Sequence, residues 1–100
     1  MKIRSLLALA GLVAAAHTAQ AQEVTLKVHF FLPPTSYANT LFIQPWCEKI
    51  AKESNNRMKC QVFPAMSMGG TPPQLVDQVK DGVADLVITL PGYTPGRFPV

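Results

Sequence analysis

Apolar and polar residues alternate along two short segments of the chain, and a third segment is almost wholly apolar. Residues 24–31 (VTLKVHFF) and 57–63 (RMKCQVF) alternate with a period of two, which is typical of β-strands. Residues 84–90 (ADLVITL) form a nearly continuous apolar run, which predicts a strand buried on both faces. Pro33 and Pro34 end the first strand, because two consecutive prolines cannot continue a hydrogen-bonded ladder.

Helical spacing replaces this alternation between the first two predicted strands. Four large apolar side chains lie near one face of residues 37–54: Leu41, Phe42, Trp46 and Ile50. Thr35 or Ser36 is the expected N-cap, because a hydroxyl oxygen can accept hydrogen bonds from the first-turn amides. Pro45 removes one backbone hydrogen bond, so we expect a bend there.

A second helix is predicted over residues 71–82. Thr71 and Gln74 resemble a capping box with proline in the first turn, and Gly82 suits the C-cap. Its apolar face consists of Leu75, Val76 and Val79. Between the first helix and the second strand, the pair Asn55-Asn56 predicts a turn, because asparagine tolerates a positive φ.

These elements follow the order β-α-β-α-β, which predicts an α/β fold with a parallel sheet in the strand order 2-1-3. Right-handed crossovers then place one helix on each face of the sheet, with the first strand in the centre. A central strand should be apolar on both faces, yet this one carries Thr25, Lys27 and His29. We therefore expect residues 22–100 to leave one of its faces incompletely covered.

Composition changes this picture mainly at the N-terminus. The chain has 100 residues, a formal net charge of +3 and 48% hydrophobic residues, which excludes disorder and a disulfide-rich scaffold. Residues 1–21 combine a basic start, an apolar run too short to cross a bilayer, and the small-x-small pattern Ala19-Gln20-Ala21. We interpret them as a signal peptide cleaved after Ala21. Cleavage leaves seven basic and six acidic residues, a charge of +1, so neither nucleic acid nor anionic lipid is an expected partner.

The ligand crevice of an open α/β sheet lies beyond the carboxyl ends of its strands, where the strand order reverses. The loops expected there, 32–36 (LPPTS), 64–70 (PAMSMGG) and 89–93 (TLPGY), contain no Asp or Glu. They therefore suit a neutral or anionic ligand better than a metal ion or an amine. The amides of residues 37–39 make the vicinity of Ser36 the best place for a carboxylate, although a purely structural cap is the simpler interpretation.

Other reactive side chains are better explained by structure than by chemistry. His29 has no second histidine or acidic neighbour, so metal binding and catalysis are not expected. A solvated or structural role is expected for Arg97, and Met66 and Met68 are interpreted as gap-filling residues. A solvated surface is expected for Asp77, Asp81 and Asp85. No catalytic residue, metal site or cofactor is predicted, because no nucleophile elbow, Walker loop, dinucleotide fingerprint or zinc-ligand spacing occurs in the sequence.

Cys47 and Cys60 are 13 residues apart and would enter an oxidising compartment after export. A disulfide between the first helix and the second strand is one possibility. Two buried thiols are the preferred interpretation, because Cys47 lies beside the inward-facing Trp46 and Cys60 shares a phase with Met58 and Val62.

Several strings together resemble one family closely. They are HFFLPPTS (29–36), FPAMSMGGTPPQL (63–75), DQV (77–79), DGVAD (81–85) and TLPGYTPGRFP (89–99). This resemblance, which covers essentially all of residues 22–100, is to the DctP family of extracytoplasmic solute-binding subunits of tripartite ATP-independent periplasmic (TRAP) transporters. The chain departs from the family pattern at Asn55-Asn56, where glycines are common, at Ser67, where glutamine is common, and at both cysteines.

The resemblance implies a two-lobed, type II-like periplasmic clamp that captures a small organic acid and delivers it to TRAP permease membrane subunits. Residues 22–100 would be an incomplete N-terminal lobe, and the family's carboxylate-binding arginine would have no counterpart here other than Arg97. The cleft-facing residues implied are Phe31, Thr35, Ser36, Met68, Gly69, Thr89 and Tyr93. Two rival interpretations remain, an exported α/β enzyme on the same scaffold and a truncated product without a transport role.

Overall fold

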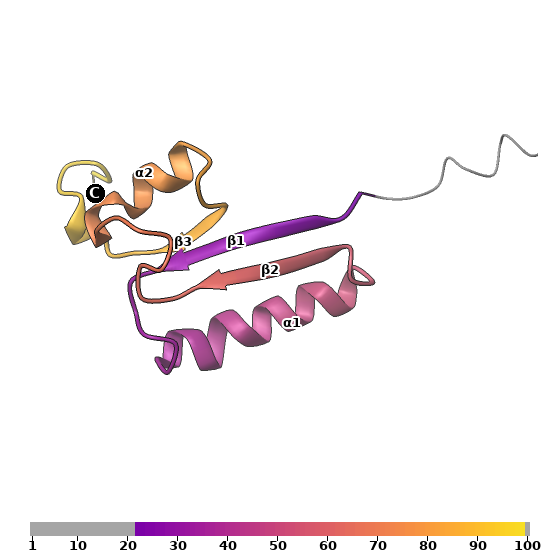
Figure 1. The fold of residues 1–100 in the computed structure, drawn as a ribbon. Coiled ribbons are helices and arrows are strands. Elements are labelled where there is room, and N and C mark those ends of the chain that lie inside the picture. Colours follow the sequence, from indigo (N-terminus) through magenta and orange to yellow (C-terminus); the bar gives the residue numbers. More distant parts are fainter. Residues whose placement is uncertain (1–21, 100) are drawn as a thin grey trace, which may run out of the picture.

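Three parallel strands form one sheet in a computed structural model of the protein, which describes residues 22–99 (Figure 1). They are β1 (Val24–Phe30), β2 (Met58–Phe63) and β3 (Leu86–Ile88), in the order β2-β1-β3. Val28 of β1 is in register with Val62 on one side and with Leu86 on the other. The predicted α/β class, parallel sheet and strand order are therefore confirmed.

The hydrophobic core lies between the sheet and α1 (Gln44–Glu53), which runs along the sheet beneath β2 in Figure 1. Val28 and Phe30 of β1 pack against Ile43 and Cys47, and all four are buried. Alternation along β1 then directs His29 to the opposite face, where it contacts the other helix, α2 (Leu75–Lys80). One helix thus covers each face, as right-handed crossovers require.

The predicted first helix begins as a π-helix over Ala38–Ile43 before α1 starts. The amide of Gln44 donates to the carbonyl of Asn39, five residues earlier. The next residue, Pro45, has no amide to donate and its ring would clash with the preceding turn of a regular α-helix. A wider, π-helical turn therefore precedes Pro45, and the bend expected there stays a prediction.

The second helix begins as a 3-10 turn (Pro72–Gln74) and continues as α2. The Thr71 amide donates to Gln74 Oε1 over 2.8 Å, which is the contact expected of a capping box. Gly82 follows α2 with φ +79°, a left-handed conformation that suits a helix C-terminus. Leu75 is fully buried against the sheet, so this short helix is held by packing as well as by its caps.

The structure confirms the predicted turn at Asn55-Asn56 but not the predicted length and burial of the third strand. Asn55 and Asn56 have φ of 54° and 62°, so the predicted turn is confirmed. The prediction of a strand over residues 84–90 buried on both faces is wrong, because β3 is shorter and its three residues are only half-buried. The reason is that β3 is an edge strand of the sheet that residues 22–99 form.

The expected gap in the cover of β1 is present at its start and closed at its end. Thr25 and Lys27 are exposed, in agreement with the prediction, whereas His29 is fully buried. The cover over His29 comes from α2, which lies near the carboxyl end of β1 and leaves the beginning of the strand open.

Cys47 and Cys60 form a disulfide, so the interpretation as two buried thiols is wrong. Because α1 packs directly on β2, the two Cα atoms are 5.6 Å apart, which is within the range that a disulfide spans. Both sulfurs lie in the core between helix and sheet, so the bond joins α1 to β2.

None of the helices between residues 22 and 99 is both long and apolar enough to span a bilayer. The predicted signal peptide and its cleavage after Ala21 lie outside the described residues.

Candidate functional site

The carboxyl ends of β1 and β3 meet at an aromatic pair. The rings of Phe31 and Tyr93 contact each other edge to face, with centroids 5.4 Å apart and planes at 84°. Phe31 directly follows β1, and Tyr93 ends a single 3-10 turn, Pro91–Tyr93, that follows β3. Because the chain crosses from β1 to β2 on one side and β3 lies on the other, this edge is the point where the strand order reverses.

Thr89 lies beside this pair. Phe30 and Ile88 are in register, so the next residues, Phe31 and Thr89, leave the sheet together. The hydroxyl oxygen of Thr89 is buried and has no hydrogen-bond partner among residues 22–99. A buried hydroxyl without a partner is unfavourable, and within residues 22–99 the structure gives it no contact that offsets this cost.

The loop of residues 64–70 folds back against the end of β1. The Ala65 amide donates to the Leu32 carbonyl over 2.8 Å, and the Met66 amide donates to the Phe30 carbonyl over 3.0 Å. Ala65 and Met66 both adopt left-handed backbone conformations, with φ of 52° and 57°. Such conformations are unfavourable outside glycine, so surrounding contacts must hold the loop in this shape.

His29 supplies one of these contacts, from a fully buried position. Its Nε2 accepts a hydrogen bond from the Met68 amide over 3.2 Å, and its Nδ1 lies 2.6 Å from Gln78 Oε1. The amide nitrogen of Gln78 in turn donates to the Gly69 carbonyl over 3.0 Å. His29 thus packs against α2 and ties this helix to the loop.

Ser36 and Thr35 lie at the start of the helical segment, beyond the aromatic pair. The Asn39 amide donates to the Ser36 carbonyl and, over 3.4 Å, to its hydroxyl, so Ser36 is the cap and Thr35 is not. The Asn39 amide is thereby used, which removes one of the three donors expected for a carboxylate. Thr35 is exposed, and its hydroxyl makes no hydrogen bond within the part of the chain that the structure describes.

Arg97 forms an ion pair with Asp77 of α2 over 2.7 Å. The structural role expected for Arg97 is therefore present. Asp77 lies at the half-exposed surface, as expected, and is paired there with the C-terminal turn. Asp85 is also engaged, since its carboxylate accepts from the Lys27 amide over 2.8 Å. Both carboxylates are used within the lobe and lie outside the candidate site.

Replacing Arg97 by alanine is expected to lower the free energy of unfolding by only about 0.5 kcal/mol, because the pair is partly exposed, at 33% for Arg97 and 50% for Asp77. Denaturant unfolding of Arg97→Ala and Asp77→Ala at low and high salt measures this effect. Equal destabilisation by the two variants, reduced by salt, is the expected result. A loss of several kcal/mol from Arg97→Ala alone would contradict it.

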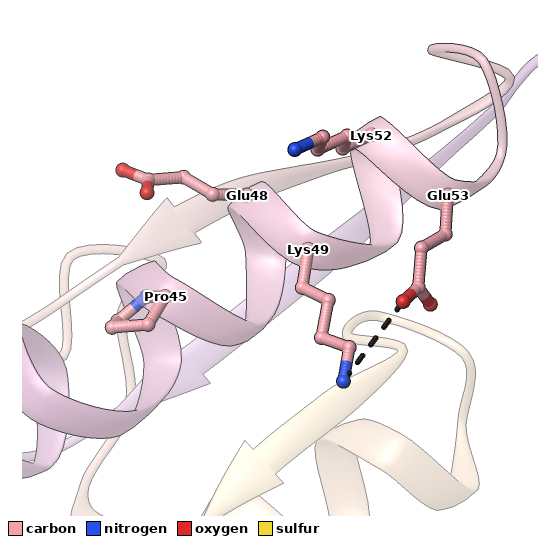
Figure 2. Close-up of a pocket in the computed structure, with 5 residues that line it drawn as sticks. All are labelled: Pro45, Glu48, Lys49, Lys52 and Glu53. Carbon is pink, nitrogen blue, oxygen red and sulfur yellow. Dashed lines mark ion pairs between the residues drawn. The ribbon is translucent and has the colours of Figure 1, made fainter.

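A shallow hollow of about 590 Å³ lies along the outer face of α1 (Figure 2). Its lining residues all come from this helix: Pro45, Glu48, Lys49, Lys52 and Glu53. Lys49 and Glu53 form an ion pair over 3.9 Å with both side chains well exposed. The hollow is therefore a solvated helix face of mixed charge and carries no candidate chemistry.

The structure brings most of the predicted cleft residues to one edge and adds two that were not expected there. Phe31, Thr89 and Tyr93 lie together, and Met68 and Gly69 belong to the loop held beside them. No hydrogen bond between described residues joins Ser36 or Thr35 to them. Gln78 was missed, and His29 was considered only as a metal ligand or catalytic residue, although a polar residue in a central strand signals that a polar partner is needed. Within residues 22–99, no group of His, Cys, Asp or Glu side chains could hold a metal ion.

Comparison with known proteins identifies the scaffold. The model of the bacterial extracellular solute-binding proteins of family 7, named DctP, matches residues 31–100. The chain belongs to this family.

Solved structures of TRAP solute-binding proteins resemble this DctP-family chain. A marine metagenome protein from an unidentified microbe, described as specific for aromatic acid ligands and crystallised with 3-hydroxybenzoate, is 56% identical, with a TM-score of 0.77 over 79% of this chain and 25% of its own. A protein from Rhodoferax ferrireducens T118, with copurified benzoate, is 50% identical, with a TM-score of 0.73 over 76% of this chain and 24% of its own.

A further relative is the outer membrane transporter protein TsaT of Comamonas testosteroni, which is 36% identical over 93 residues, or 92% of this chain and 27% of TsaT. This chain therefore spans about a quarter of the length of the relatives it matches.

Proposed function

We propose that this chain forms part of the first lobe of a periplasmic solute-binding protein that captures an aromatic carboxylate and delivers it to TRAP permease membrane subunits. The observation that carries the proposal is the Phe31–Tyr93 pair at the point where the strand order reverses. Cleavage after Ala21 would release the lobe into the periplasm. The two similar proteins, whose structures contain 3-hydroxybenzoate and copurified benzoate, support an aromatic acid as the ligand.

The chemistry of the edge fits the two ends of such a ligand. An aromatic ring packs favourably against a pair of rings through offset or edge-to-face contact. The amides of Tyr37 and Ala38, which donate no backbone hydrogen bond among the described residues, are donors for a carboxylate. The edge loops carry no acidic residue that would repel an anion.

A closed binding site needs a second wall, because a solute-binding cleft buries most of its ligand between two lobes. Residues 22–99 supply one sheet and its edge loops, which form a single wall. We therefore expect residues 22–100 alone to bind organic acids weakly. A two-lobed hybrid, in which residues 22–100 replace the matching segment of the marine metagenome protein, provides both walls for a test.

Calorimetry on this hybrid is expected to give a Kd of about 1 μM or lower for 3-hydroxybenzoate, and at least tenfold weaker binding of cyclohexanecarboxylate, which has the same ring size without aromaticity. Residues 22–100 alone are the matched control and should give no micromolar binding. A folded hybrid that binds no aromatic acid, or that prefers the saturated acid, would contradict the proposed function. Micromolar binding by residues 22–100 alone would contradict the need for a second wall.

A further inference from the structure

The loop of residues 64–70 has an unusual backbone, in which two residues other than glycine adopt a positive φ. Ala65 and Met66 are left-handed, and Gly69 and Gly70 have φ of 91° and 84°. Left-handed residues other than glycine persist only where neighbouring groups hold them. Two backbone hydrogen bonds within the loop, from Ser67 to Pro64 and from Gly69 to Met66, support this shape, and contacts from the rest of the protein complete it.

Two sets of hydrogen bonds hold the two halves of this loop. The end of β1 and the residues after it hold the first half through the backbone, at the amides of Ala65 and Met66. The second half is tied to the first by one backbone hydrogen bond, from the Gly69 amide to the Met66 carbonyl over 2.8 Å. Its contacts with the rest of the protein run through side chains, from His29 to the Met68 amide and from Gln78 to the Gly69 carbonyl. The position of the second half thus depends on these two side chains.

The hydrogen bonds of this group fix the ring of His29 in one tautomer. The Met68 amide can only donate, so Nε2 of His29 is the unprotonated acceptor and Nδ1 carries the proton. That proton is donated to Gln78 Oε1, which leaves the amide nitrogen of Gln78 to donate to Gly69. Every donor meets an acceptor, so the arrangement has a single consistent form.

Gly70 provides the space that this arrangement requires. A Cβ atom at position 70 would lie 2.8 Å from the Gln78 amide nitrogen and 2.9 Å from Gln74 Oε1. Any larger residue there would displace the Gln78 amide from Gly69. The loop backbone and Gln78 are therefore fitted to each other.

We propose that His29 and Gln78 act as positioning residues, which fix Met68 and Gly69 at the ligand-binding edge and thereby set ligand affinity without touching the ligand. This inference rests on the proposed function, because it concerns the same edge. Both residues lie on the face of the sheet opposite the α1 core, at the carboxyl end of β1. A loss of either contact loosens the second half of the loop, which keeps its backbone hydrogen bond to Met66, while the strands and their pairing remain.

The test measures 3-hydroxybenzoate binding by the two-lobed hybrid carrying His29→Leu, Gln78→Ala or His29→Gln. His29→Leu and Gln78→Ala are each expected to weaken binding about tenfold, because the loop must then be ordered when ligand binds. His29→Gln, which keeps an acceptor near the Met68 amide, should stay within roughly threefold of the unchanged hybrid. Gln78→Ala favours the helix and keeps the backbone intact, so it remains informative if His29→Leu does not fold.

Ile43→Ala is the matched control, because Ile43 is equally buried but lies in the core on the other face. It should lower the Tm without changing the Kd. The ¹⁵N signals of the His29 ring should report a single tautomer with unprotonated Nε2, and a mixture in Gln78→Ala. If the unchanged hybrid does not bind, the proposed function fails. The positioning role is overturned if the unchanged hybrid binds and His29→Leu and Gln78→Ala bind as tightly as it does. It is also overturned if these two variants lose only as much affinity as Ile43→Ala does.

Discussion

Removal of the disulfide, by replacing Cys47 and Cys60 together with alanine, is expected to lower the free energy of unfolding by about 3 kcal/mol. The bond closes a loop across 13 positions of sequence and joins α1 to β2. Without it, the unfolded chain gains the freedom that the closed loop denies it, while the native packing loses little. Since small domains are stable by only about 5–15 kcal/mol, this loss is a large part of the total.

Denaturant unfolding of the double variant and of the unchanged protein, each with and without a reducing agent, measures this effect. Reductant should destabilise the unchanged protein to the level of the double variant and leave the double variant unaffected. Peptide mapping without reduction should yield one linked fragment that contains both cysteines. Equal stability of the oxidised and reduced unchanged protein, or separate fragments, would contradict the bond.

The sheet and its connections could be predicted because they depend on local patterns. The alternation of residues 24–31 and 57–63 identifies two of the strands. Right-handed crossovers with one helix on each face of the sheet then correspond to the order 2-1-3, which the structure has. Asn55 and Asn56 mark a turn because few other residues adopt its backbone conformation. Each of these features is decided by a few consecutive residues.

The disulfide could not be decided in the same way. The sequence pattern indicates that both cysteines point inward. The pattern is the same for a free thiol and for a disulfide-bonded cysteine, so it does not distinguish the two. Whether they meet depends on how α1 is placed along β2, which packing of Ile43 and Phe30 determines. Such a placement is a property of the assembled core and not of either segment.

The candidate site was predictable as a set of loops and only partly as a set of contacts. The switch-point rule brings Phe31, Thr89 and Tyr93 to one edge, and the structure places them there. The contact of His29 with Gln78 spans 49 positions of sequence, and no local pattern links them. Left-handed backbone at Ala65 was also unexpected, because nothing in that residue favours it.

Replacing Tyr93 by alanine in the two-lobed hybrid is expected to weaken 3-hydroxybenzoate binding by about 30-fold, or about 2 kcal/mol, as truncation of a central aromatic residue commonly does. Tyr93→Phe keeps the ring and should retain most of the affinity. Phe31→Ala should cause a similar loss, and the double variant should lose less than the sum of the two, because each ring supports the other at 5.4 Å. Calorimetry on the four proteins gives the coupling directly.

Phe98→Ala serves as the control for this cycle, since Phe98 is an aromatic residue that is 52% exposed and is not part of the pair. Its affinity should equal that of the unchanged hybrid. Cyclohexanecarboxylate should lose less affinity than 3-hydroxybenzoate in Tyr93→Ala, because a saturated ring gains only burial from the pair, whereas an aromatic ring also gains edge-to-face attraction. Equal losses for both acids would mean that the pair merely shapes the wall, and unchanged binding in Tyr93→Ala would place the ligand elsewhere.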